Sequence, residues 1–241
     1  MDVYWLEQTE SDVPVENDWL CARETVCLAA LRIPKRRADW RVGRWTAKRA
    51  VAVYLNVPAH PEVLARIEVR PAPSGAPEVL FSNKPAAVTI SLSHRNGTAV
   101  CAVAPPDVEL GCDLELVEPH SGAFISDYFT AEEQALAARA PAADRDRLFA
   151  LLWSAKESAL KELHEGLRVD TRSVIVSLGH VSCDLYGWSP MEVLHSDGRI
   201  FHGWWQHADS MVRTLVAAPP PNPPVRLQIP VYVSDTAYVC A

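Results

Sequence analysis

The chain has 241 residues, of which 49% are apolar and 22% are charged, a composition typical of a globular protein with one large domain or two small ones. No stretch contains the roughly 18–20 apolar residues that a membrane span requires, and the acidic start lacks the features of a secretory signal. The six cysteines are scattered without a Cys-x-x-Cys pair, which favours reduced thiols over a zinc site or a disulfide framework. We therefore expect a cytoplasmic protein without a membrane association.

The net charge of −7 argues against general nucleic-acid binding, but the charge is unevenly distributed. Residues 32–49 contain eight Lys or Arg and one acid, which leaves the rest of the chain at −14. Such a segment is either a local anion site or the solvated face of a basic helix.

In chain order, the first half begins with a strand at 2–6 and continues with two helices, at about 17–31 and 36–55, separated by Pro34. The apolar period then changes to that of strands, which we expect at 66–70, 78–82, 87–94 and 97–104. The stretch SHRNG between the last two is typical of a hairpin turn.

A similar order follows after Pro105 and Pro106. We expect a strand at 108–116, helices at 131–139 and 144–164, and strands at 173–179, 181–187, 191–195 and 211–218. The repeated order predicts an α+β protein of two duplicated halves, although no clear sequence repeat accompanies it. The expected division is 1–106, 107–218 and 219–241, the last being a Pro-rich connector followed by either an added strand or a loose tail.

The stretch GCDLE places two carboxylates on one face of a strand, because alternate strand residues share a face. Asp113 and Glu115 repel each other unless a cation or a proton lies between them. In proteins, Mg²⁺ takes one or two carboxylates together with waters and phosphate oxygens. The pair is therefore either a metal site or the alternating acids of a half-exposed strand.

The helix expected at 144–164 contains WSAKESALKELHEGL, in which Glu157 and Lys161 lie one turn apart on one face. If this helix crosses the GCDLE strand, Glu157 adds a third carboxylate and Lys161 adds a cation, a set suited to a polyphosphate. The alternative is an exposed salt bridge that contributes only about a few tenths of a kcal/mol.

The stretch SLSHRNG offers groups that bind phosphate. Ser91 and Ser93 share one strand face, and His94 and Arg95 follow at the turn. A serine hydrolase is not expected, because there is no G-x-S-x-G elbow and adjacent strand side chains point to opposite faces.

The basic helix, SLSH, GCDLE, YFTAEE and WSAKESALK together resemble, in this order, the Sfp-type 4′-phosphopantetheinyl transferases. The motifs of that family are S-H, G-[I/V/C]-D-[I/L/M]-E, F-[ST]-x-x-E and W-[ST]-x-K-E-x-x-x-K. The resemblance runs from about Arg36 to Val176, and Gly166-Leu167 follows the last motif as in many relatives.

The resemblance implies an α+β fold of two halves related by a pseudo-twofold axis, and a monomer. It implies an enzyme, a holo-carrier-protein synthase that transfers 4′-phosphopantetheine from coenzyme A to a serine of an apo acyl or peptidyl carrier protein. The client protein would belong to fatty acid, polyketide or non-ribosomal peptide biosynthesis. Mg²⁺ would be the cofactor and 3′,5′-ADP the by-product.

The resemblance also implies roles for individual residues. Asp113, Glu115 and Glu157 would hold Mg²⁺. Glu157 would take the serine proton, directly or through a water, with a metal-bound water as the rival base, and Lys161 would neutralise the pyrophosphate. Glu133 occupies the F-[ST]-x-x-E position without an assigned role. The residues expected to bind coenzyme A are Arg44, Ser93, His94, Lys156 and Lys161.

Three positions depart from the family pattern, one of them Glu165, which precedes Gly166-Leu167 where basic residues are frequent. Ala76 stands where many relatives have a basic residue before the S-H strand, and Arg95 stands where a small residue is usual. Ala76 supports an alternative function, a coenzyme A- or carrier-binding protein with weak or no transferase activity. A phosphohydrolase that uses the same carboxylates is a further alternative. The W-S-x-K-E-x-x-x-K helix and the S-H pair argue against it, because a hydrolase needs neither motif at this spacing.

The surface expected to meet the carrier protein is the segment 117–129, which joins the GCDLE strand to the next helix. Phe124 and Ile125 in this segment are either partner contacts or ordinary core residues.

Overall fold

The computed structural model describes residues 1–164, 169–178 and 187–229. Its α-helices are α1 (Ala22–Ala30), α2 (Pro34–Tyr54), α3 (Pro61–Leu64), α4 (Gly122–Tyr128), α5 (Ala131–Arg139) and α6 (Arg145–Glu162). Its strands are β1 (Tyr4–Thr9), β2 (Ile67–Pro71), β3 (Pro77–Phe81), β4 (Lys84–Pro85), β5 (Thr89–Arg95), β6 (Thr98–Ala104), β7 (Glu109–Leu116), β8 (Val174–Leu178), β9 (Ser189–His195), β10 (Ile200–Ala208), β11 (Met211–Ala218) and β12 (Val225–Arg226).

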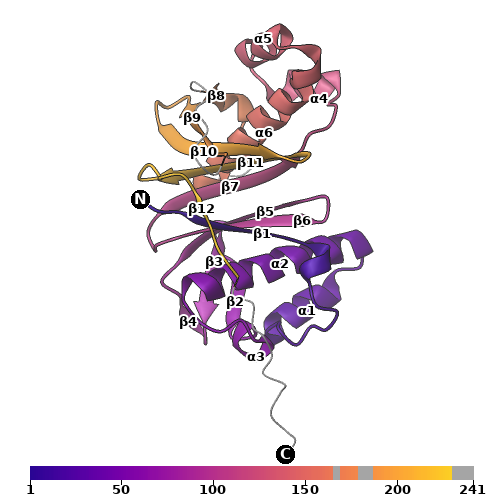
Figure 1. Ribbon diagram of the computed structural model, residues 1–241, viewed down its shortest axis with the longest axis vertical. Helices are drawn as coiled ribbons and strands as arrows, with labels where there is room; N and C mark the ends of the chain where they lie inside the picture. The colour runs from indigo at the N-terminus through magenta and orange to yellow at the C-terminus, as the bar shows by residue number, and fades with distance from the viewer. Residues whose placement is uncertain (165–168, 179–186, 230–241) are drawn as a thin grey trace, which may run out of the picture.

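Two sheets meet in the middle of the molecule, and each is packed against a long helix on its other side (Figure 1). The first sheet has the strand order β12-β1-β6-β5 and carries α2, and the second has the order β7-β11-β10-β9-β8 and carries α6. A small third sheet, β2-β3-β4, lies beside α2. The expected α+β class is confirmed.

Strands β6 and β11 are apolar almost throughout, because both of their faces are covered. In β6, Val100 and Ala102 face the core between the two sheets, whereas Cys101 and Val103 face the core under α2. The four cysteines in the described ranges, Cys21, Cys27, Cys101 and Cys112, are free thiols, as expected.

Several predicted boundaries shift for local reasons. The first helix begins at Ala22 rather than near residue 17, because the preceding turn inserts the fully buried Trp19 into the core, with its Nε1 donating to Glu16 O at 2.9 Å. Pro34 does not separate two elements but is the first residue of α2, where a missing N–H costs nothing.

The second half of the chain also differs from the prediction in places. Strand β10 was not predicted, and α4 forms inside the segment expected to be a connection. The strand expected at 181–187 falls almost wholly outside the described residues, as does Gly166-Leu167.

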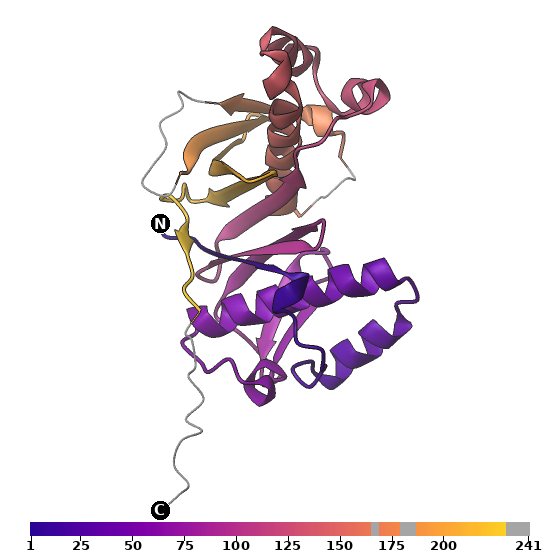
Figure 2. The same cartoon turned by 45° about the vertical axis from the view of Figure 1, so that its right-hand side comes forward.

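The Pro-rich connector leads back across the molecule, and β12 then pairs in parallel with β1 (Figure 2). Asn222 N donates to Met1 O at 2.7 Å, and Leu227 N donates to Trp5 O at 2.8 Å. Val225–Arg226 are therefore an added strand, and the rest of the expected tail from residue 230 lies outside the described residues. No helix within the described ranges combines the length and the apolar character that crossing a bilayer requires.

Candidate active site

The SLSH and GCDLE strands meet where the two sheets face each other. Strands β5 and β7 pack together, although they belong to different sheets. Ser91 Oγ accepts a hydrogen bond from Cys112 N at 2.9 Å, and Ser93 Oγ donates to Asp113 Oδ1 at 2.8 Å. Two motifs about 20 residues apart in sequence are thus joined by buried hydrogen bonds.

Helix α6 crosses β7 in close contact at Gly111. A Cβ at this glycine would lie 1.8 Å from Ser158 O, so no larger residue fits without moving the helix. The crossing brings Lys161 Nζ to 2.6 Å from Asp113 Oδ1 and 3.1 Å from Cys112 O. Lys161 therefore pairs with the strand, and the exposed salt bridge with Glu157 that its spacing allowed does not form in the described structure.

Two carboxylate oxygens at this crossing are buried without a hydrogen-bond partner, Asp113 Oδ2 and Glu157 Oε1. Burial and the neighbouring Asp113 raise the pKa of Glu157. Burial lowers the pKa of Lys161, but the attraction of Asp113 and the other facing groups outweighs it, so the net pKa is raised and the ammonium stays charged. Asp113 and Glu157 thus form a carboxylate cluster at the crossing, with one fixed cation, Lys161.

Glu115 lies beside this pair but has partners for both oxygens. Trp153 Nε1 donates to Glu115 Oε1 at 3.1 Å, and Arg95 Nε lies 3.4 Å from Glu115 Oε2. Burial, followed by repulsion from Asp113, raises the pKa of Glu115 to about 7. The sequence motif did not reveal these two partners, although the unusual Arg95 after His94 was a visible signal.

His94 lies between α2 and the carboxylate cluster of Asp113 and Glu157. A Cβ added to Gly43 on α2 would be 3.8 Å from His94 Cδ2. Desolvation is the largest influence on the pKa of His94 and lowers it, Lys161 lowers it further, and Asp39 on α2 and Asp113 oppose this. Ser93 therefore contacts Asp113 directly, and His94 is close enough to Asp113 for its charge to influence the pKa of the imidazole.

Part of the basic segment has a structural role that is neither an anion site nor a solvated face. Arg37 donates to Leu28 O and Leu31 O, and Arg41 donates to Pro14 O and Val15 O. These guanidinium groups fasten α2 to the loops that precede it.

Arg44 lies apart from the carboxylates. It lines a cavity of about 400 Å³ between α1, α2 and β2, where its guanidinium is 5.1 Å from the Trp40 ring centroid. Arg44 Nε lies 3.9 Å from Glu24 Oε1.

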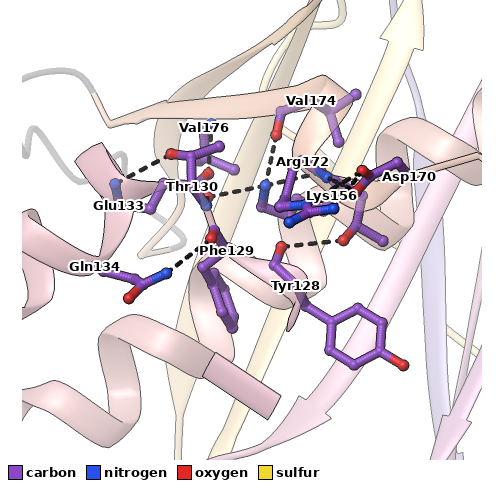
Figure 3. Close-up of polar contacts among 11 residues, drawn as sticks. Tyr128, Phe129, Thr130, Glu133, Gln134, Lys156, Asp170, Arg172, Val174 and Val176 are labelled. Atoms are coloured by element: carbon purple, nitrogen blue, oxygen red, sulfur yellow. Dashed lines mark hydrogen bonds and ion pairs between the residues drawn. The ribbon is translucent and has the colours of Figure 1, made fainter. Parts of the chain in front are cut away.

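The structure corrects the expectation for Lys156, which cannot reach coenzyme A. Its side chain is 0% exposed, and Nζ lies 2.9 Å from Glu133 Oε2, 2.9 Å from Thr171 O and 2.5 Å from Val174 O. Figure 3 shows Lys156 and Glu133 converging beneath β8, where Glu133 Oε1 also accepts from Val176 N at 3.2 Å. Lys156 and Glu133 therefore form a buried ion pair that fastens α6 to α5 and β8.

The same arrangement occurs in the first half, around Lys48 and Glu24. Lys48 Nζ lies 2.5 Å from Glu24 Oε2 and donates to Trp19 O and Leu64 O, and Glu24 Oε1 accepts from Val69 N at 3.1 Å. Glu24 and Glu133 each occupy the third position of a helix in a capping box. These contacts support the predicted duplication.

With the two lysines aligned, a short sequence repeat becomes visible. Trp45-Thr46-Ala47-Lys48 on α2 corresponds to Trp153-Ser154-Ala155-Lys156 on α6. At the next position α2 has Arg49 and α6 has Glu157, and where α6 has Lys161 α2 has Val53. Of these two helices, only α6 therefore carries the carboxylate and the ammonium group that meet Asp113.

Phe124 and Ile125 pack against the core under α6 as half-buried residues. The Phe124 ring lies 5.0 Å from that of Trp153, whose indole N–H holds Glu115. The short helix α4 thus rests on the residue that positions one of the carboxylates.

The donor set suits a divalent cation in part. Asp113 Oδ2 and Glu157 Oε1 are hard oxygen donors that are buried and lack partners, and their mutual repulsion favours a cation between them. No group of three acidic, histidine or cysteine side chains is arranged to hold a metal within the described ranges. The expected three-carboxylate set is therefore not preformed, and Glu115 is the member already engaged elsewhere.

A comparison with protein families matches the part of the chain that contains Asp113, Glu157 and Lys161. Residues 109–198, which include β7 and α6, match the model of the 4′-phosphopantetheinyl transferase superfamily. A search of curated proteins finds no match. On the evidence of this match and of the motifs that converge at the crossing of β7 and α6, the part of the chain that contains this crossing is similar to the 4′-phosphopantetheinyl transferase superfamily.

Proposed function

We propose that this protein transfers 4′-phosphopantetheine from coenzyme A to a serine hydroxyl of an apo acyl or peptidyl carrier protein, with 3′,5′-ADP as the by-product. The observation that carries the proposal is the convergence of Asp113, Glu157 and Lys161 at one crossing of strand and helix. The family match supports phosphopantetheine transfer in general.

The chemistry assigns distinct tasks to these side chains. The serine Oγ forms a bond to the phosphorus next to pantetheine, the bond from that phosphorus to the bridging oxygen breaks, and the hydroxyl proton is accepted by a base. Glu157 is suited to be that base, directly or through a water, because its raised pKa makes it more basic than an ordinary carboxylate. Lys161, held in its charged form, offsets the negative charge of the departing phosphate.

Asp113 and Glu157 would hold Mg²⁺ through their unpartnered oxygens, with Glu115 as the third candidate. When bound, Mg²⁺ would neutralise charge on the pyrophosphate. Ser93 and His94 lie beside the same carboxylates and would contact coenzyme A there. Arg44 would bind a more distant part of it through the cavity that it lines.

The other expectations accompany this proposal. The protein would be cytoplasmic and monomeric, and its halves would be 1–106 and 107–218, with 219–241 as the connector and tail. The carrier protein would dock on segment 117–129, because α4 lies directly over Trp153. The half-buried state of Phe124 supports a structural role for that ring.

The test is to incubate the protein with coenzyme A, Mg²⁺ and a panel of apo carrier proteins from fatty acid, polyketide and non-ribosomal peptide systems. We expect at least one carrier to gain the mass of one phosphopantetheine, with an equal release of 3′,5′-ADP and loss of the reaction in EDTA. Binding of coenzyme A without mass gain on any carrier would favour the binding-protein alternative.

A further inference from the structure

Arg95 lies beside the carboxylate cluster, between Glu115 and Glu118. It ends β5, its side chain is 43% exposed, and it contacts Glu115 through Nε and Glu118 through Nη2. Because Trp153 occupies the other oxygen of Glu115, both oxygens of this carboxylate are engaged. Asp113 and Glu157, in contrast, each keep one buried oxygen without a partner.

We infer that Arg95 is a latch on Glu115, an internal cation that a divalent metal must displace before Glu115 can bind the metal. The inference rests on the proposed function, because it takes Asp113, Glu115 and Glu157 as the candidate metal ligands. It adds a residue that controls how readily the third ligand becomes available.

The physical basis is competition between two cations for one carboxylate. A guanidinium and a divalent cation repel each other, and both require the oxygen of Glu115 that faces Arg95. Glu118, whose side chain is 42% exposed, remains an ion-pair partner for the guanidinium of Arg95 after the guanidinium is displaced from Glu115. Arg95 can therefore leave Glu115 without becoming unpaired.

The latch has a direct consequence for metal affinity. Removing the charge of Arg95 frees Glu115 and also removes a repulsive charge beside the metal. Since an exposed ion pair is weak, the expected gain is about 3- to 10-fold in the dissociation constant of the metal.

The experiment measures Mn²⁺ binding to the full-length protein without coenzyme A, by electron paramagnetic resonance of the free ion. We expect Arg95→Met to bind Mn²⁺ about 3- to 10-fold more tightly than the wild type and Arg95→Lys, which keeps the charge, to stay near it. The matched control is Arg147→Met, which removes an equally exposed arginine (46%) from an ion pair with Asp144 at the start of α6. Its Mn²⁺ affinity should not change.

The variant Asp113→Asn distinguishes a failure of the proposed role of Arg95 from a failure of the proposed metal site. We expect it to weaken Mn²⁺ binding at least about 10-fold, because Asp113 is a ligand in every version of the site. If it does so while Arg95→Met binds no more tightly than the wild type, the latch is wrong and the metal site stands. If Asp113→Asn binds Mn²⁺ like the wild type, the proposed metal site is wrong and the latch is overturned with it.

Discussion

Asp113 is the residue on which the charge balance of the site depends. One oxygen accepts from Ser93 and Lys161, and the other is buried without a partner. Burial and then repulsion from this carboxylate raise the pKa of both Glu115 and Glu157. Three acids thus share a space in which their full ionisation is unfavourable until a cation enters.

Because the pKa of Glu115 is raised in the folded protein, the free energy of unfolding depends on pH. Its folded-state pKa of about 7 lies above the ordinary value of 4.5, so the folded protein holds a proton that the unfolded chain releases. The free energy of unfolding therefore falls as pH rises from about 4.5 to 7. We expect metal-free Glu115→Gln to be more stable than the wild type at pH 8, by roughly 1–3 kcal/mol, and to lose this advantage near pH 5.

Urea unfolding at the two pH values, followed by circular dichroism, measures this difference. Glu118→Gln is the control, because it also removes a glutamate paired with Arg95 but from a more exposed position. An equal stability difference for Glu115→Gln at pH 5 and pH 8 would show that Glu115 has an ordinary pKa.

At the scale of elements, the site depends on how closely α6 approaches β7. Gly111 permits this approach, and Asp113 and Lys161 meet two residues further along the strand. We expect Gly111→Ala to lower the free energy of unfolding by about 2–3 kcal/mol and to remove phosphopantetheine transfer, because the added methyl group forces the helix backbone away.

Gly122→Ala is the matched control for that substitution. Gly122 is the first residue of α4, and a Cβ there meets no atom within 4 Å. Its stability should stay within about 0.5 kcal/mol of the wild type. Wild-type stability and activity in Gly111→Ala would contradict the close contact between α6 and β7.

The two buried ion pairs hold the two long helices in equivalent ways. Breaking a buried pair leaves an uncompensated charge, so we expect Lys48→Met and Lys156→Met each to cost about 3–5 kcal/mol in unfolding free energy. The double variant Glu133→Gln/Lys156→Met should lose less than the sum of its single changes. A stable Lys156→Met protein with only a raised KM for coenzyme A would instead restore Lys156 as a phosphate ligand.

At the scale of the whole molecule, the two sheets are joined by more than the site. Arg213 on β11 makes a two-pronged ion pair with Glu7 on β1, at 2.5 and 2.7 Å, and the rings of Trp5 and Trp188 lie 5.5 Å apart. Strand β12 adds the end of the chain to the first sheet. These contacts fix the two sheets against each other, so that β5 and β7 can supply one site.

Much of this organisation could be predicted from the sequence. The period of apolar residues located the long helices and the strands around SLSH and GCDLE, because each of these elements buries a regular face. Strand β10 was missed because Gly203 and the adjacent apolar pairs Ile200-Phe201 and Trp204-Trp205 interrupt the alternation typical of a strand. Gly203 itself is required, since a Cβ there would lie 2.0 Å from Leu215 O.

Partners of individual side chains were harder to predict. The helical position of Lys156, one residue before Glu157, could not show that its ammonium is enclosed by Glu133 and two carbonyl groups from distant segments. The pairing of Arg95 with Glu115 likewise depends on how two sheets meet. Such contacts are set by tertiary packing, which spacing along one element does not encode.

The most direct test of the central claim compares two glutamates on α6, the half-buried Glu157 and the buried Glu162. Glu157 lies close to Asp113, whereas Glu162 lies five residues further along the helix and close to Glu109, and burial and Glu109 raise its pKa to about 7. The measurement is intact-mass spectrometry of an apo carrier protein incubated with coenzyme A, Mg²⁺ and each variant. We predict that Glu157→Gln reduces the rate of phosphopantetheine transfer at least about 100-fold and that Glu162→Gln keeps it within a few-fold of the wild type. Equal rates for the two variants would contradict the assignment of the site to this crossing.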